Sequence, residues 1–142
     1  MEFKSPIELV KQFNKSFGVI TKKTPEVLQE EDWSLKAKLM KEELSEYIEA
    51  CEKSDIVDIA DAVIDMQYIL SGIVLAHGLQ NVFDKLFQEV HDSNMSKLEN
   101  GKVLRRDDGK VLKGKNYFKP DLNKILENGW YYRWKNKKNF RL

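Results

Sequence analysis

The chain has 142 residues, which is enough for one ordinary domain with a single hydrophobic core. Its composition, 42% hydrophobic and 33% charged with three prolines and seven glycines, excludes a disordered or low-complexity protein. The formal net charge of +1 at pH 7 favours no class of partner by itself. We expect no signal peptide and no membrane segment, because no apolar run approaches the roughly 20 residues that a span needs. The single cysteine cannot form an internal disulfide, and we therefore expect a cytoplasmic protein.

The charge is distributed unevenly along the chain. Residues 131–142 carry five bases and no acid, so the remaining residues hold 19 bases against 23 acids. This difference corresponds to a net charge of about −4 for the rest of the chain. We therefore divide the chain into a main domain, residues 1–130, and a basic aromatic tail, residues 131–142. The tail interleaves aromatic residues with bases, a pattern that can stack nucleobases and contact phosphates.

The hydrophobic period is helical through the first hundred residues and predicts four helices. Their ends follow from capping signals, namely a proline in the first turn, Ser or Asp before a helix and Gly after it. In chain order, we expect helices from Ser5-Pro6 to about Gly18, from about Trp33 to Lys53, from a Ser54-Asp55 cap to His77, and from about Asn81 to Leu98.

The pattern changes after residue 100. Residues 102–113 predict a short β-hairpin that turns on Asp108-Gly109, and Pro120-Asp121 can begin a last short helix. The expected fold class is therefore all-α, a helical bundle of four to five helices with a short appended β-hairpin.

Two of the predicted helices carry acids among apolar residues. On helix 33–53, Glu43 and Glu46 lie one turn apart on a secondary apolar stripe. Helix 56–76 is apolar nearly all round, as a buried central helix would be, and its three acids fall within about 60° of one another at 100° per residue. These acids are Asp58, Asp61 and Asp65.

Carboxylates on a buried face need compensation, because like charges repel and a buried ion loses its hydration. A Mg²⁺ ion between the two helices is the economical solution, since it prefers carboxylate oxygens and bridges to substrate phosphates. The alternative interpretation is an acidic stripe exposed to solvent at the edge of the bundle.

The fourth predicted helix carries Asn94 and Lys97 near its end, on the continuation of its inward face. A lysine suits phosphate oxygens as a point charge, and an asparagine can orient a base or a sugar. A lysine at this position can also simply stabilise the helix dipole. Cys51 lies on the predicted core face and is interpreted as a buried small hydrophobe. His77 and His91 show no metal-binding spacing and are interpreted as ordinary helix-terminus histidines.

Several of these residues form recognisable motifs. Glu42-Glu43-Leu44-Ser45-Glu46, followed by Asp58-Ile59-Ala60-Asp61, resembles the EExxE…ExxD signature of the MazG-like and phosphoribosyl-ATP pyrophosphohydrolase-like superfamily. Two later stretches are similar to the phosphoribosyl-ATP pyrophosphohydrolase-like branch: His91-Asp92-Ser93-Asn94-Met95-Ser96-Lys97 and Lys110-Val111-Leu112-Lys113-Gly114. The chain departs from the signature at Asp58, which stands where the superfamily usually has the longer Glu.

The resemblance implies an all-α protein, usually dimeric or tetrameric, that hydrolyses a nucleoside triphosphate or a related nucleotide to the monophosphate and pyrophosphate. It implies a dependence on Mg²⁺, for which Mn²⁺ could substitute. By matching position, the implied metal ligands and catalytic residues are Glu43, Glu46, Asp58 and Asp61. The implied contacts with the nucleotide are Asn94, Lys97 and Lys113.

Two other functions remain open from the residues. The chain could be a non-catalytic family member that acts as an interaction scaffold. It could also be a helical module that binds nucleic acid through the basic tail, although the acidic main domain would repel a long polyanion.

Overall fold

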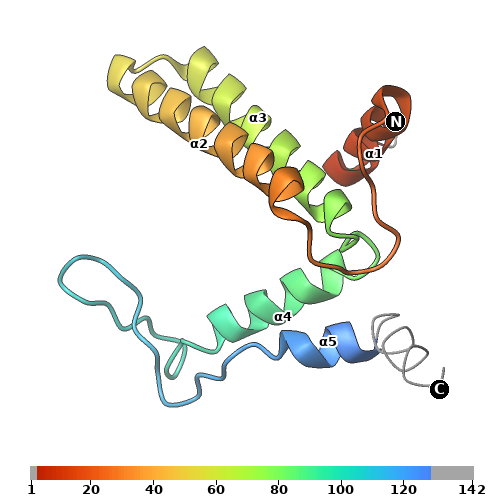
Figure 1. The fold of residues 1–142 in the computed structure, drawn as a ribbon. Helices are drawn as coiled ribbons and strands as arrows, with labels where there is room; N and C mark the ends of the chain where they lie inside the picture. Colours follow the sequence, from red (N-terminus) through yellow and green to blue (C-terminus); the bar gives the residue numbers. More distant parts are fainter. Residues whose placement is uncertain (1–2, 129–142) are drawn as a thin grey trace, which may run out of the picture. The chain divides into compact units, whose positions relative to one another are not determined.

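The computed structural model describes residues 3–128, and this part of the chain contains five α-helices and no β-strand (Figure 1). In chain order these are α1 (Pro6–Phe17), α2 (Glu30–Lys53), α3 (Ile56–Ala76), α4 (Phe83–Met95) and α5 (Leu122–Asn128). The described residues divide between two compact units, one up to residue 80 with α1 to α3 and one from residue 81 on with α4 and α5. The all-α prediction is therefore confirmed. The predicted tail, residues 131–142, and the boundary that precedes it lie outside the described residues.

The first helix begins and ends where its sequence signals predict. Ser5 Oγ accepts a hydrogen bond from the backbone N–H of Glu8, and the Ser5 N–H donates to Glu8 Oε2 at 2.8 Å. This reciprocal capping box and Pro6 in the first turn fix the start of α1. Gly18 ends the helix in the left-handed conformation, with φ +66°.

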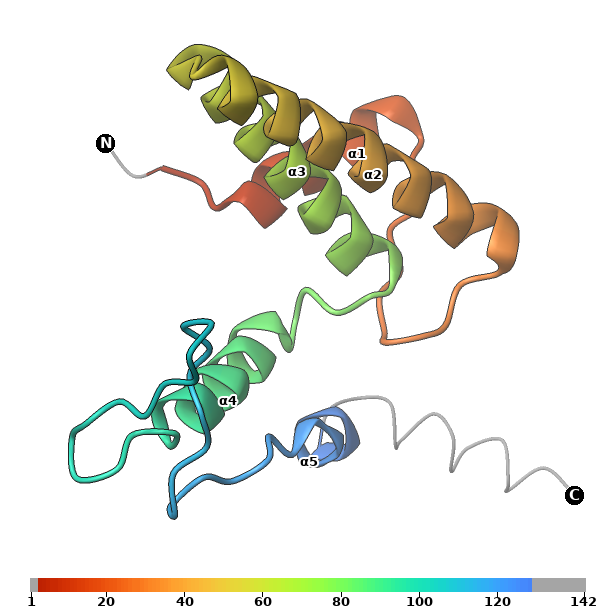
Figure 2. The same ribbon diagram turned by 90° about the vertical axis from the view of Figure 1, so that its left-hand side faces the viewer.

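The helices α2 and α3 form an antiparallel pair that lies side by side along most of its length (Figures 1 and 2). A tight connection at Ser54 joins them, and Asp55 then caps α3 by accepting hydrogen bonds from the N–H groups of Val57 and Asp58. The helix α1 packs against α3. The carboxylate-bearing segments of α2 and α3 are therefore brought together by a short local connection.

The loop between α1 and α2 crosses the C-terminal end of α3. Backbone hydrogen bonds join Lys22 N to Leu75 O at 2.9 Å and Glu26 N to His77 O at 3.0 Å. Gly78 allows this close approach, because its φ is +69° and a Cβ atom there would collide with the backbone carbonyl of Thr24. The buried apolar residues of this unit are Val10, Leu28, Ala50, Ala62, Val74, Leu75 and Ala76.

The third helix is not buried on all sides, contrary to the prediction. Among the described helices, α1 and α2 are the ones that pack on α3, and Ile56, Val57 and Ile64 are 73%, 72% and 61% exposed. Its N-terminal half is mostly exposed, with Ala62 as the exception, and Asp58, Asp61 and Asp65 are exposed rather than buried as predicted. The C-terminal end beneath the α1–α2 loop is buried. By length and composition alone α3 could cross a membrane, a weak criterion that the core helices of water-soluble proteins also meet.

The buried face of α2 also differs from the prediction. Cys51 is exposed rather than buried, and the adjacent Ala50 takes the buried position at 3% exposure. The stripe that contains Glu43, Glu46 and Ala50 therefore turns toward α3, whereas Leu44 is 47% exposed on the broader apolar stripe. The acids of α2 consequently lie along the seam between the two helices.

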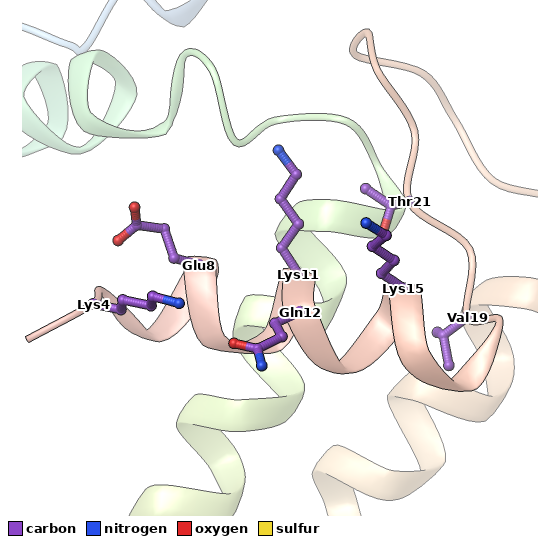
Figure 3. Close-up of a pocket in the computed structure, with 7 residues that line it drawn as sticks. All are labelled: Lys4, Glu8, Lys11, Gln12, Lys15, Val19 and Thr21. Atoms are coloured by element: carbon purple, nitrogen blue, oxygen red, sulfur yellow. The ribbon is translucent and has the colours of Figure 1, made fainter.

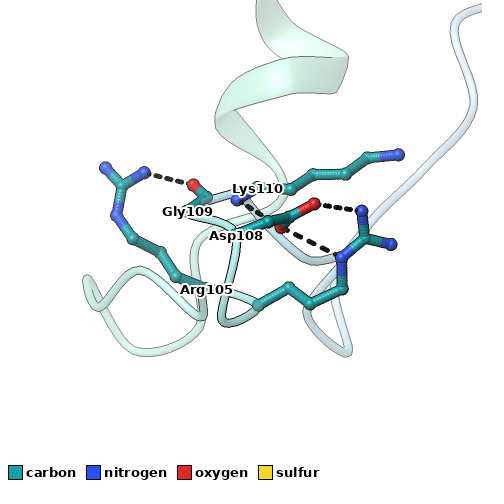
Figure 4. Close-up of polar contacts among 5 residues, drawn as sticks. Arg105, Asp108, Gly109 and Lys110 are labelled. Atoms are coloured by element: carbon teal, nitrogen blue, oxygen red, sulfur yellow. Dashed lines mark hydrogen bonds and ion pairs between the residues drawn. The ribbon is translucent and has the colours of Figure 1, made fainter.

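The second unit does not contain the predicted β-hairpin. The chain does turn at Asp108-Gly109, where Arg106 N donates to Lys110 O at 2.8 Å and the Arg106 side chain pairs with Asp108. At the same turn, Lys110 N donates to Asp108 Oδ1 and the Arg105 side chain donates to the Gly109 oxygen (Figure 4). Beyond this turn, an isolated bridge pairs Arg105 with Val111 and Leu112 N donates to Leu104 O at 2.8 Å, but the described residues form no strand. Because every residue from 101 to 113 is exposed, no buried face stabilises a ladder of strands. The short helix expected after Pro120-Asp121 is confirmed as α5.

Candidate active site

Acids from α2 and α3 line one polar cavity in the seam between these helices. The cavity has a volume of about 410 Å³, and its lining residues are Glu46, Glu49, Ala50, Lys53, Asp58 and Asp61. Three of the four predicted metal ligands are therefore brought together from two helices. The connection at Ser54 and the cap at Asp55 determine this register, because they place the first turns of α3 beside the last turns of α2.

Glu43, the fourth predicted ligand, lies in the same seam, one helical turn before Glu46 in α2. Its Oε2 atom is buried and has no hydrogen-bond partner among the described residues. Burial raises the pKa of the Glu43 carboxyl, and the negative charges of Glu46, Asp65 and Asp61 raise it further. Glu43 therefore faces acids of both helices, including Asp65, which matches no position of the sequence signature.

These residues fit a hard divalent cation by their chemistry. All the donors are carboxylates, the group that Mg²⁺ prefers, and the unpartnered Glu43 oxygen is destabilised by its acidic neighbours. In residues 3–128, however, no three His, Cys, Asp or Glu side chains stand close enough to hold a metal ion in this conformation. Metal binding would therefore need the carboxylates to turn toward one another.

Lys53 and Glu49 belong to this cavity, although the sequence analysis did not select them. Lys53 Nζ lies 3.9 Å from Glu49 Oε2, and both side chains are more than half exposed. The sequence could have indicated both residues, because positions 49 and 53 lie on the same helical face as Glu46 and Ala50. Lys53 supplies a cation at the edge of an otherwise acidic cavity.

The predicted nucleotide contacts lie in the second unit, at the C-terminal end of α4. Lys97 Nζ donates a hydrogen bond of 2.6 Å to Asn94 Oδ1. Gly114 approaches this helix end so closely that a Cβ atom on it would lie 2.9 Å from the Lys97 carbonyl oxygen. Lys113, the third predicted contact, precedes Gly114, and its Nζ lies 4.4 Å from the centre of the Tyr117 ring. The fold thus gathers the segments that carry Asn94, Lys97 and Lys113.

A second cavity of the first unit lies along α1 and was not expected from any motif. Its volume is about 690 Å³, and its lining residues are Lys4, Glu8, Lys11, Gln12, Lys15, Val19 and Thr21 (Figure 3). Lys11 and Lys15 extend from the same side of α1, with Thr21 beside Lys15. Three lysines against one acid make this cavity attractive to anions.

The histidine at the end of α3 contacts the backbone of the α1–α2 loop. His77 is the C-terminal cap of α3, and its Nδ1 lies 2.9 Å from the backbone oxygen of Glu26. This contact agrees with the interpretation of His77 as a helix-terminus histidine.

Comparison with known proteins identifies the family. The model of the phosphoribosyl-ATP pyrophosphohydrolase family matches residues 10–94, which include all four predicted carboxylates and end at Asn94. The chain belongs to this family. The resemblance seen in the sequence motifs is thereby confirmed, and the family supports a nucleotide pyrophosphohydrolase activity in general. No curated protein matches the chain significantly.

Proposed function

We propose that the protein is a Mg²⁺-dependent pyrophosphohydrolase that cleaves a nucleoside triphosphate or a related nucleotide to the monophosphate and pyrophosphate. The observation that carries this proposal is the seam between α2 and α3, where acids of two helices share one cavity and Glu43 keeps a buried, unpartnered oxygen. A structural role for Glu43 gives no reason to leave a buried carboxylate oxygen without a hydrogen-bond partner.

In this proposal, Glu43, Glu46, Asp58 and Asp61 hold Mg²⁺, or Mn²⁺ in its place. When bound, the cation polarises a phosphate oxygen and lowers the pKa of a coordinated water. The ammonium of Lys53 lies at the same cavity and attracts the phosphate chain toward it. Asp65, on the same stripe of α3, orients a water molecule through its carboxylate.

The residues of the second unit bind the nucleotide. Lys97 offers a positive charge to the phosphate chain of the nucleotide, and Asn94 orients the sugar or the base. Lys113 contacts a phosphate oxygen as a further point charge. The hydrogen bond between Lys97 and Asn94 holds both side chains at the end of α4 before the substrate arrives.

We further propose that the protein is a homodimer or homotetramer. The exposed apolar residues of α3 include Ile56, Val57 and Ile64, and α2 adds Leu35 at 58% and Ile48 at 49% exposure. Apolar surface of this extent on one pair of helices favours association with a second copy through helix–helix contacts.

A pyrophosphate-release assay over a panel of nucleotides tests the proposed activity. Each nucleotide is incubated with the protein in Mg²⁺, in Mn²⁺ and in EDTA. We expect release with at least one nucleotide in Mg²⁺ or Mn²⁺ and none in EDTA. Full activity in EDTA would exclude the metal-dependent mechanism, and no release from any nucleotide would favour a non-catalytic scaffold.

A further inference from the structure

The segment 113–118 is held against the C-terminal end of α4 by specific contacts. Ser93 Oγ, which is buried, donates to the backbone oxygen of Phe118 at 2.8 Å, and the Phe118 N–H donates to Ser96 Oγ at 3.1 Å. The close approach of Gly114 to the Lys97 carbonyl fixes the other end of the segment. Two serine side chains of the helix end and the close approach of Gly114 thus hold this segment in place, although it has no regular secondary structure.

This segment presents a lysine over an aromatic ring. Lys113 Nζ lies 4.4 Å from the centre of the Tyr117 ring, within the range of a cation–π interaction. The Tyr117 N–H donates to Gly114 O at 3.2 Å, which closes a turn that brings the two side chains together. Tyr117 is half-buried and Lys113 is exposed, so the ammonium lies on the accessible side of a fixed ring.

We infer that the Tyr117 ring is the stacking surface for the nucleobase of the substrate, and that the base takes the place of the Lys113 ammonium. This inference rests on the proposed function and adds a residue that no motif indicated. An exposed cation–π contact is weaker than the stacking of one base on an aromatic side chain, so the exchange favours the bound nucleotide. The released ammonium then contacts a phosphate oxygen of the same nucleotide.

The exchange has a consequence for substrate choice. Stacking on a ring face depends little on which base is bound, because every nucleobase presents a π-face. Hydrogen bonds to the edges of a base, in contrast, discriminate between bases. The Tyr117 ring therefore contributes affinity for nucleosides in general, and it contributes little to discrimination among bases. The ligand class of this subsite is a nucleoside phosphate, and a phosphate compound without a base does not use the ring.

Calorimetric titration in Mg²⁺ of the intact protein with four ribonucleoside monophosphates and with inorganic pyrophosphate tests this inference. Tyr117→Ala is compared with Tyr117→Phe, which keeps the ring, and with Phe87→Ala, which removes an exposed ring elsewhere in the same unit. We expect Tyr117→Ala to weaken binding of the monophosphates by roughly 5-fold to 150-fold. Pyrophosphate affinity should stay unchanged, and the two other variants should bind like the wild type.

Three results would overturn the inference. The first is unchanged binding of every monophosphate by Tyr117→Ala, and the second is no binding of any monophosphate by the wild type. The third is an equal loss of affinity for monophosphates and pyrophosphate in Tyr117→Ala, which a purely structural role of the ring would give. These titrations need no turnover. A wild type that binds monophosphates through Tyr117 but hydrolyses nothing would support the inference and contradict the proposed activity alone.

Discussion

Lys97 and Asn94 are joined by a hydrogen bond of 2.6 Å from Nζ to Oδ1, across one turn at the end of α4. The hydrogen bond holds the Lys97 ammonium, which suits a phosphate oxygen, beside the Asn94 amide, which suits a sugar or a base. Lys97→Met should lower kcat/KM by about 10-fold to 150-fold, the usual worth of a hydrogen bond to a charged group. Steady-state kinetics of this variant check the loss, with the exposed Lys102 changed to Met as the control. Equal activity of both variants would remove Lys97 from the substrate contacts.

Glu46 tests the carboxylate cavity, since it lines the cavity and is exposed within α2. Glu46→Gln keeps the size of the side chain and removes its charge, so we expect turnover to fall by about 100-fold or more. The circular dichroism spectrum should not change, because the Glu46 side chain makes no hydrogen bond to another described residue and Gln is an equally good helix former. Glu52→Gln changes an acid of the same helix outside the cavity and should keep full activity. A fully active Glu46→Gln would contradict the ligand assignment.

Glu43 makes the stability of the metal-free protein depend on pH. Burial first, and then its acidic neighbours, raise the pKa of this carboxyl above its ordinary value. The folded state therefore holds the proton more tightly than the unfolded state, and stability falls as pH rises from the ordinary value through the raised one. Melting curves in EDTA across this range should show the decline, and Mg²⁺ should oppose it above the raised pKa.

The matched variant for that measurement is Glu43→Gln, which cannot ionise. We expect it to melt higher than the wild type in EDTA at neutral pH and to gain less from Mg²⁺. If the wild type and Glu43→Gln melted alike at every pH, with and without Mg²⁺, the Glu43 carboxylate would not be destabilised by its surroundings.

The exposed apolar surface of α3 leads to a prediction about assembly. Ile64→Glu places a charge on a side chain that is 61% exposed in the single chain, so it should not disturb folding of the first unit. It should convert the oligomer to monomers, because an unpaired charge cannot be buried between copies. Light scattering measures the mass, and Ile64→Leu is the conservative control. A wild type that is a monomer at every concentration would contradict the proposed assembly.

The parts of the fold that depend on neighbouring residues were predicted well from the sequence. The start at Ser5-Pro6, the stop at Gly18 and the N-cap at Asp55 act within one helical turn, so their residue types indicate the helix ends directly. The carboxylate stripes were predicted for the same reason, since a helical wheel shows that Glu43 and Glu46 share a face.

The parts that depend on tertiary packing were predicted less well. Periodicity shows that a face is apolar but not which of two apolar stripes meets the next helix, and so Cys51 was assigned the burial that Ala50 has. The predicted strands around Asp108-Gly109 lacked a surface to pack on, so the turn forms with one isolated bridge beyond it but no strands. The contact of Lys113 with Tyr117 arises from a fold-back of the chain that no local pattern encodes.

The central claim is cleavage between the α- and β-phosphates by the carboxylate cavity with a divalent cation. Phosphorus NMR of a nucleoside triphosphate that proves active, recorded during turnover in Mg²⁺, tests it most directly. We predict that the monophosphate and pyrophosphate appear in equal amounts, that both appear at least about 100-fold more slowly with Glu46→Gln, and that neither appears in EDTA. Formation of the diphosphate and inorganic phosphate, or unchanged turnover by Glu46→Gln in EDTA, would contradict the claim.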